Sequence, residues 1–175
     1  MNKALDELKI QAKILLKSVK ENHPTATQRL KRHYKYYQEG SVYQPKLKHC
    51  QQVVACESGF LDWQHAHQIL SANDLNQDKQ TSMGSFWHDH RCNALLNYWF
   101  SNYPEAAIFH QGKPETYLFP YNHQFIVATQ EYVQAIGLHE LDPTLWHIVQ
   151  NNLVASYTSD AWDKIALARL QNRII

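Results

Sequence analysis

Residues 47–63 read LKHCQQVVACESGFLDW, and this stretch decides most of the expected fold. Its apolar positions recur at helical intervals, which predicts a helix beginning after Pro45. Gly59 stands where that helix should end, because glycine readily adopts the left-handed geometry of a C-terminal cap. Phe60 then returns to the core, and the carboxylate of Asp62 is suited to cap a following helix. The stretch therefore predicts two helices joined by a tight turn.

Further helices are predicted on both sides of this stretch. Before it, apolar residues at three- and four-residue steps indicate a helix over 3–21 and a second one from Thr25 to Tyr37. After it, the pattern predicts helices at 63–70, near 89–102, from Pro104 to Phe109, and over 130–137, 143–154 and 160–173.

Residues 116–129 differ from the rest of the chain. Two runs rich in aromatic and β-branched residues flank Asn122 and His123, which predicts two short strands or a small hairpin. Pro120 restricts its strand to the edge of a sheet, because proline has no amide hydrogen to donate. The predicted fold class is mainly α, with a small two-stranded β element.

The chain divides into two parts by composition. Residues 71–84 are polar and show no periodic pattern, which indicates a linker. We therefore expect a basic helical module at 1–70 and a helical domain with a short β-hairpin at 85–175.

Charge is distributed very unevenly along the chain. Residues 1–50 hold eleven Lys and Arg against four Asp and Glu, a net of +7, whereas residues 51–175 hold six against twelve, a net of −6. Such an asymmetry indicates a polyanionic or acidic partner for the basic part. Docking of the two halves onto each other is the alternative explanation.

Composition also bounds the location of the protein. The apolar runs are far shorter than the roughly 20 residues needed to cross a bilayer, so no membrane partner is expected. The first residues do not resemble a secretory signal. Three cysteines without a close-spaced framework favour reduced thiols. We expect a cytoplasmic protein.

Residues 26–70 resemble a bacterial helical module found at the N-termini of some ankyrin-repeat and glyoxalase-related proteins. Its signature is a helix of the pattern Leu-x-x-(Ala/Cys)-Gln-x-(Val/Leu)-(Ile/Val)-Ala, followed by Gly-Phe-x-x-Trp. The matching residues here are Leu47, Gln51, Val53, Val54, Ala55, Gly59, Phe60 and Trp63. The resemblance implies a helical fold for this region and no particular activity. Residues 85–175 resemble no family in this way.

A run of cations and tyrosines just before the module is the main candidate site. Cations neutralise phosphates, and tyrosine rings offer stacking faces for unpaired bases. We therefore predict a non-enzymatic accessory or regulatory factor whose basic module binds nucleic acid or a ribonucleoprotein. The predicted contact residues are Arg29, Lys31, Arg32, Tyr34, Lys35, Tyr36, Lys46 and Lys48.

Two other interpretations remain open. His88, His90 and Cys92 are metal-ligand types, and they would serve a small, metal-assisted enzyme. Residues two apart on a helix point in nearly opposite directions, so this spacing is poor and we predict neither a metal site nor a cofactor. The other interpretation is a protein-only adaptor, in which the basic module binds an acidic protein partner. The acidic C-terminal part would then be a second protein-binding surface.

Overall fold

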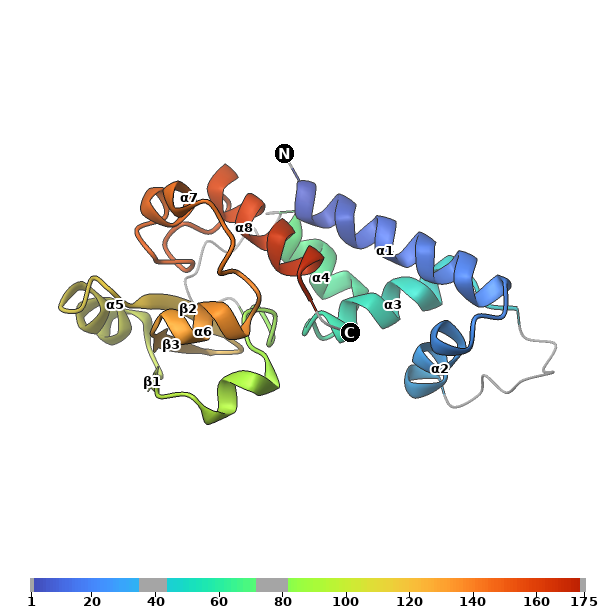
Figure 1. Ribbon diagram of the computed structural model, residues 1–175, viewed down its shortest axis with the longest axis horizontal. Helices are drawn as coiled ribbons and strands as arrows, with labels where there is room; N and C mark the ends of the chain where they lie inside the picture. The colour runs from blue at the N-terminus through green and yellow to red at the C-terminus, as the bar shows by residue number, and fades with distance from the viewer. Residues whose placement is uncertain (1, 35–43, 72–81, 174–175) are drawn as a thin grey trace.

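The computed structural model describes residues 2–34, 44–71 and 82–173 (Figure 1). Helices make up most of this part of the chain, and a small antiparallel sheet accompanies them. The predicted class, mainly α with a small sheet, is confirmed.

Four helices form the described residues of the N-terminal part: α1 (Lys3–Lys20), α2 (Pro24–His33), α3 (Leu47–Glu57) and α4 (Trp63–Leu70). The apolar stripe of α1 is buried and packs mainly against α3 and against the C-terminal helix α8 (Asp160–Gln171). The first helix ends close to its predicted limit. The second ends at His33, and the rest of its predicted length lies outside the described residues.

The turn between α3 and α4 has the predicted geometry. Gly59 has a φ of +87°, its amide donates to Cys56 O at 3.0 Å, and the amide of Phe60 donates to Ala55 O at 3.1 Å. This pair of bonds is the Schellman arrangement that closes a helix with glycine. Asp62 caps α4 by accepting from the amide of His65 at 2.7 Å.

Among the described residues the sheet has three strands, one more than predicted. Its strands β1 (Asn97–Phe100), β2 (Tyr117–Tyr121) and β3 (Gln124–Ala128) are antiparallel in the order β1-β3-β2. The predicted hairpin is β2–β3. The prediction of a helix near 89–102 was wrong, because that segment forms the short 3₁₀ helix η1 (His90–Ala94) and then the strand β1.

The outer edge of β2 is closed by a later segment. Leu118 donates its amide to Asn151 O at 2.8 Å and accepts at its carbonyl from the amide of Leu153 at 2.9 Å. Pro120, opposite Phe125, lies at this edge of the hairpin, as its missing amide requires.

The other C-terminal helices are short: α5 (Tyr103–Gln111), α6 (Gln130–Ala135) and α7 (Pro143–Ile148). The helix predicted over 143–154 ends early because Gln150 and Asn151 both have a φ of +52°. This left-handed backbone turns the chain so that Asn151 reaches β2.

One hydrophobic core runs through both parts of the chain. It contains Leu8 of α1, Val53 of α3, Trp87 and Trp162. Met83, within the predicted linker, is also buried in it. The division into 1–70 and 85–175 stays a prediction. None of the described helices is apolar enough over a sufficient length to span a membrane.

Candidate nucleic-acid interface

Two side-chain contacts fix α2 against α3. The guanidinium of Arg29 on α2 binds the carboxylate of Glu57 at the end of α3, with Nη2–Oε2 at 2.6 Å. The ring of Tyr34, just after α2, packs edge-on against His49 in the first turn of α3, with 5.2 Å between ring centroids. The C-terminal end of α2 therefore lies beside the N-terminal end of α3.

Three of the predicted cations are exposed near this junction. Arg32 lies in the last turn of α2, and Lys46 and Lys48 lie at the start of α3. Within the described part of the chain, none of the three forms an ion pair with a carboxylate. We call Arg32, Lys46 and Lys48 the basic surface. Lys31 is half-buried beside it.

The backbone of α3 adds to the positive potential here. The amino end of a helix carries a partial positive charge, and α3 has no acidic residue in its first turn. His49 is buried there, and its Nδ1 accepts a hydrogen bond from the amide of Lys46 at 3.0 Å. Burial, together with the charges of Lys48 and Lys46, lowers the pKa of His49. His49 is therefore a neutral packing residue, and the lysines carry the charge.

Other predicted contact residues have roles inside the fold. Arg29 is engaged by Glu57 through both Nε and Nη2. Tyr34 is partly buried against the core and against His49, which reduces its free ring surface. Lys35 and Tyr36 lie outside the described residues. The sequence contained one signal for the pairing of Arg29. Glu57 is an acidic residue at the end of the helix that follows the basic segment.

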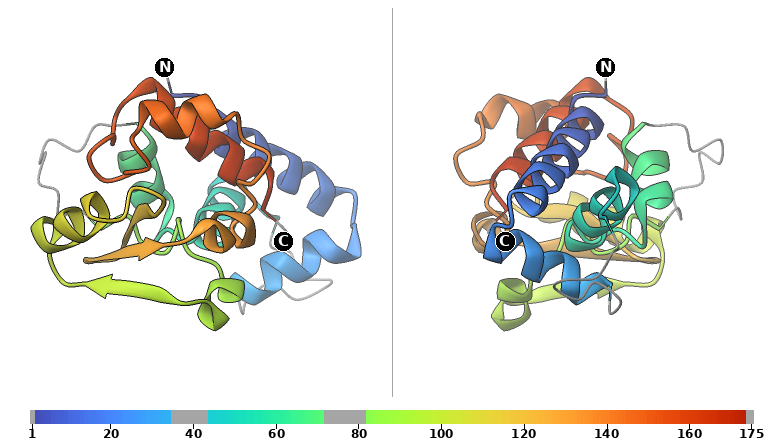
Figure 2. Two further views of the ribbon diagram at one scale, coloured as in Figure 1. Left: turned by 60° about the vertical axis from the view of Figure 1, so that its left-hand side comes forward. Right: turned by 90° about the vertical axis from the view of Figure 1, so that its right-hand side faces the viewer.

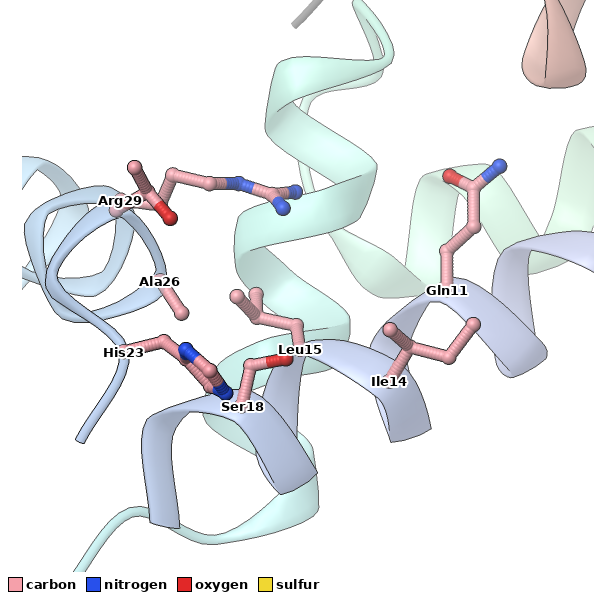
Figure 3. A pocket seen from close by; sticks show the side chains of 8 residues that line it. Gln11, Ile14, Leu15, Ser18, His23, Ala26 and Arg29 are labelled. Carbon is pink, nitrogen blue, oxygen red and sulfur yellow. The ribbon is translucent and has the colours of Figure 1, made fainter. Parts of the chain in front are cut away.

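A groove of about 340 Å³ lies between α1 and α2 (Figure 3). Leu15 and Ala26 give it apolar walls, Ser18 and His23 stand at one end, and the Arg29 side chain extends past it toward α3. Arg29 is the single Lys or Arg among the described residues of its lining, and Glu57 already neutralises that charge. A phosphate chain therefore finds less attraction in this groove than at the basic surface.

The side chains of the alternative His/Cys cluster do not converge. His88 is held by Tyr132 Oη at 2.9 Å and Asn93 Oδ1 at 3.0 Å, whereas His90 is 87% exposed beside Asp89. Cys92 is buried, and burial raises the pKa of its thiol, the opposite of what a nucleophile needs. Among the described residues, no group of three or more His, Cys, Asp or Glu side chains is arranged to hold a metal ion.

The surroundings of His88 form a buried polar network. Arg169 of α8, 1% exposed, donates to the carbonyls of Phe86, Ile136 and His88. Its Nη2 also lies 3.8 Å from Asp89. Each contact satisfies a group that burial would otherwise penalise, so the network fastens α8 to residues 86–89 and to the end of α6. Sequence patterning gave no sign of it, because a lone arginine in a helix normally faces solvent.

Two hollows of about 380 and 390 Å³ flank Trp146 and His147. In the part of the chain that the structure describes, neither lining contains a Lys or Arg. His110, which borders one of them, already bonds Thr116 Oγ1 and Gln150 O through its two ring nitrogens. These hollows offer no counter-ion to a phosphate.

No protein family, curated protein or solved structure matches this chain. The resemblance of residues 26–70 to the bacterial helical module stays a prediction.

Proposed function

We propose that the protein is a non-enzymatic accessory factor that binds the phosphate backbone of a nucleic acid, free or within a ribonucleoprotein. The observation that carries this proposal is the basic surface. It combines exposed cations from two helices with the amino end of α3. Arg32, Lys46 and Lys48 are the proposed phosphate contacts, and Lys31 flanks them.

The chemistry of the surface favours nucleic acid over an acidic protein partner. Exposed cations bind phosphates by releasing condensed counter-ions, which needs no matching apolar surface. A protein interface normally has a well-packed apolar centre, often with aromatic anchors. Tyr34, the described aromatic side chain closest to these cations in sequence, packs edge-on against His49.

The internal ion pair supports the proposal as well. Glu57 is the described carboxylate that reaches α2, and it is bound by Arg29 and lies 4.0 Å from His33 Nε2. The Glu57 side chain is only 14% exposed, and Arg29 neutralises its charge. A carboxylate neutralised in this way opposes the binding of a polyanion less than a free one would.

The test is purification of the full chain from its producing cells with and without nuclease. We expect an absorbance ratio at 260 and 280 nm raised by bound nucleic acid, which nuclease lowers. A variant with Arg32→Ala, Lys46→Ala and Lys48→Ala should purify free of nucleic acid. If the unchanged protein carries none, or the variant carries as much, the proposal is wrong. Loss of a protein partner in the variant without any nucleic acid would instead support the adaptor interpretation.

A further inference from the structure

The first helix has an exposed face that carries apolar side chains. Its buried stripe packs mainly against α3 and α8, whereas Ile10 and Ile14 are 50% and 59% exposed on another side of the helix. Figure 2 (right) shows α1 in front of α8 and above α2, with no other helix or strand drawn over it. Residues four apart on a helix are neighbours, so the two isoleucines form one apolar spot on its surface.

The residues around this spot follow the repeat of a coiled coil. Steps of four and three residues alternate from Lys3 onward, and an average step of about 3.5 keeps side chains on one stripe of a helix. We call this set the outer stripe; it consists of Lys3, Glu7, Ile10, Ile14, Lys17 and Glu21, the C-cap of α1. Glu7 is half-buried, and the other members of the stripe are exposed.

The outer stripe complements itself when it is reversed. We consider α1 laid antiparallel on α1 of a second copy, with a two-fold axis beside residue 12, so that positions equally far from the axis meet. Glu7 then meets Lys17 of the second copy. Lys3 meets its Glu21, and Ile10 meets its Ile14. Opposite charges thus face each other at both ends, and four isoleucines form the apolar centre. An unrelated helix has no reason to match all of these pairs, so the pattern favours a second copy as the occupant.

The charges of the outer stripe are only weakly engaged within one chain. Glu7 accepts a hydrogen bond from the neutral amide of Gln11 at 3.0 Å. Lys17 lies 3.9 Å from Glu21, which also lies 3.4 Å from His23. The side chains of Lys17 and Glu21 are 78% and 50% exposed. Exposed ion pairs between neighbouring residues contribute little, so these groups keep their attraction for charges on a second copy.

We propose that two copies of this chain associate through the outer stripe, with α1 packed antiparallel on α1 of the second copy across a two-fold axis. The same surface serves both partners in such an interface. The isoleucines bury their exposed area against each other, and the charged pairs fix the direction and the register of the helices. The association does not depend on nucleic-acid binding, and it brings two basic surfaces into one particle.

The size of the interface makes the dimer a weak one. At 1.5 Å per residue α1 is about 27 Å long, and one pair of such helices buries less than the roughly 1,200 Å² of a standard stable interface. Lys13 lies beside the axis and comes near Lys13 of the second copy, although its long stem lets the ammonium group stay in solvent. We therefore expect a dissociation constant on the order of 10–100 µM.

Sedimentation velocity of the nuclease-treated full chain over a concentration series tests the proposal. Nuclease excludes dimers bridged by nucleic acid, so the result is independent of the proposed function. We expect a monomer–dimer equilibrium, and Ile10→Lys should raise the dissociation constant about tenfold or more because it puts a charge against Ile14 of the second copy. The matched control, Ile148→Lys, makes the same change at an exposed residue of α7 and should leave the equilibrium unchanged. A chain that stays monomeric to roughly millimolar concentration overturns the proposal, and so does a dimer that both variants weaken equally.

A charge exchange tests the register. Glu7→Lys and Lys17→Glu should each raise the dissociation constant several-fold, because each creates two contacts between like charges in the dimer. The double variant restores opposite charges and should recover most of the affinity. Positions 7 and 17 are about 15 Å apart along one helix, too far for contact within a chain, so recovery reports contact between copies. Single variants without effect, or a double variant no tighter than the singles, contradict this register. Circular dichroism checks that all three variants keep their helices.

Discussion

The Nε and Nη2 atoms of Arg29 lie 3.1 and 2.6 Å from the same carboxylate oxygen of Glu57, across the interface between α2 and α3. The pair joins the middle of one helix to the end of the next, and both side chains are mostly buried, at 24% and 14% exposed. It makes Arg29 a structural residue within the basic segment. The exposed Arg32 of α2 depends on it for its position relative to α3.

Removal of Arg29 should destabilise the fold more than it weakens polyanion binding. Arg29→Ala leaves the Glu57 carboxylate partly buried without its partner, so we expect a loss of about 1 to 3 kcal/mol in the free energy of unfolding. Arg32→Ala, at an exposed position, should change it by less than about 0.5 kcal/mol. Urea denaturation followed by circular dichroism gives both values. Equal, small effects would show that the ion pair has no structural role.

Gly59 should not tolerate a side chain. Its φ of +87° strains any other residue, and a Cβ there would lie 2.7 Å from the carbonyl carbon of Ser85 and 2.8 Å from the amide of Phe86. We expect Gly59→Ala to lower the free energy of unfolding by about 2 kcal/mol or more. Gly112→Ala is the matched control, since the nearest atom to its Cβ would be 3.5 Å away. Thermal unfolding compares the two variants. Equal losses of stability in both would refute this account of the turn.

Asp89 should make stability depend on acid pH. Burial raises the pKa of its carboxyl, but the hydrogen bonds from Arg91 and the charges of Arg91 and Arg169 outweigh this and lower it to about 2. A depressed pKa means that the folded state binds the proton less readily than the unfolded chain, whose value is about 3.9. The contribution of about 2 kcal/mol is therefore complete above pH 5 and is lost as the pH falls toward 2.

Asp89→Asn provides the check on this contribution. The variant should be less stable at neutral pH, and its free energy of unfolding should fall less steeply between pH 5 and 2. Urea unfolding at a series of pH values measures both slopes. Parallel pH profiles for the two proteins would contradict the assignment.

The three cysteines should react with a thiol reagent at very different rates. Cys50 and Cys92 are buried, and burial raises the pKa of Cys50 to about 11 despite the nearby charge of Arg29. Cys56 is half-buried, so it should react first. We expect one fast thiol in the folded protein, absent in Cys56→Ser, and three fast thiols in denaturant. A fast Cys92 would instead revive the enzyme interpretation.

Local geometry was predictable from the sequence wherever neighbours along the chain decide it. Gly59 and Asp62 end one helix and begin the next through bonds to residues within five positions, and both were identified. The hairpin was identified for the same reason, since its strands are joined by the two residues Asn122 and His123.

The features that escaped prediction depend on distant residues. Trp99 and Phe100 fit a helical period. They form a strand of only four residues because they pair with β3, which lies more than twenty residues later in the chain. A strand that short shows too few alternations to be recognised. Arg29 and Glu57 are 28 positions apart, and Arg169 reaches Phe86 over 83. Such pairs follow from packing, which a linear pattern does not contain.

Arg32, Lys46 and Lys48 are the proposed phosphate contacts, and the salt dependence of binding tests this assignment most directly. Fluorescence anisotropy with a labelled oligonucleotide gives the dissociation constant at several salt concentrations. For the triple alanine variant at these positions, the slope of log affinity against log salt should be less steep by about 2 to 3. A control variant with Lys3→Ala, Lys13→Ala and Lys164→Ala loses the same number of positive charges at residues outside the basic surface. It should keep most of the slope. Equal slopes for the two variants would contradict the claim.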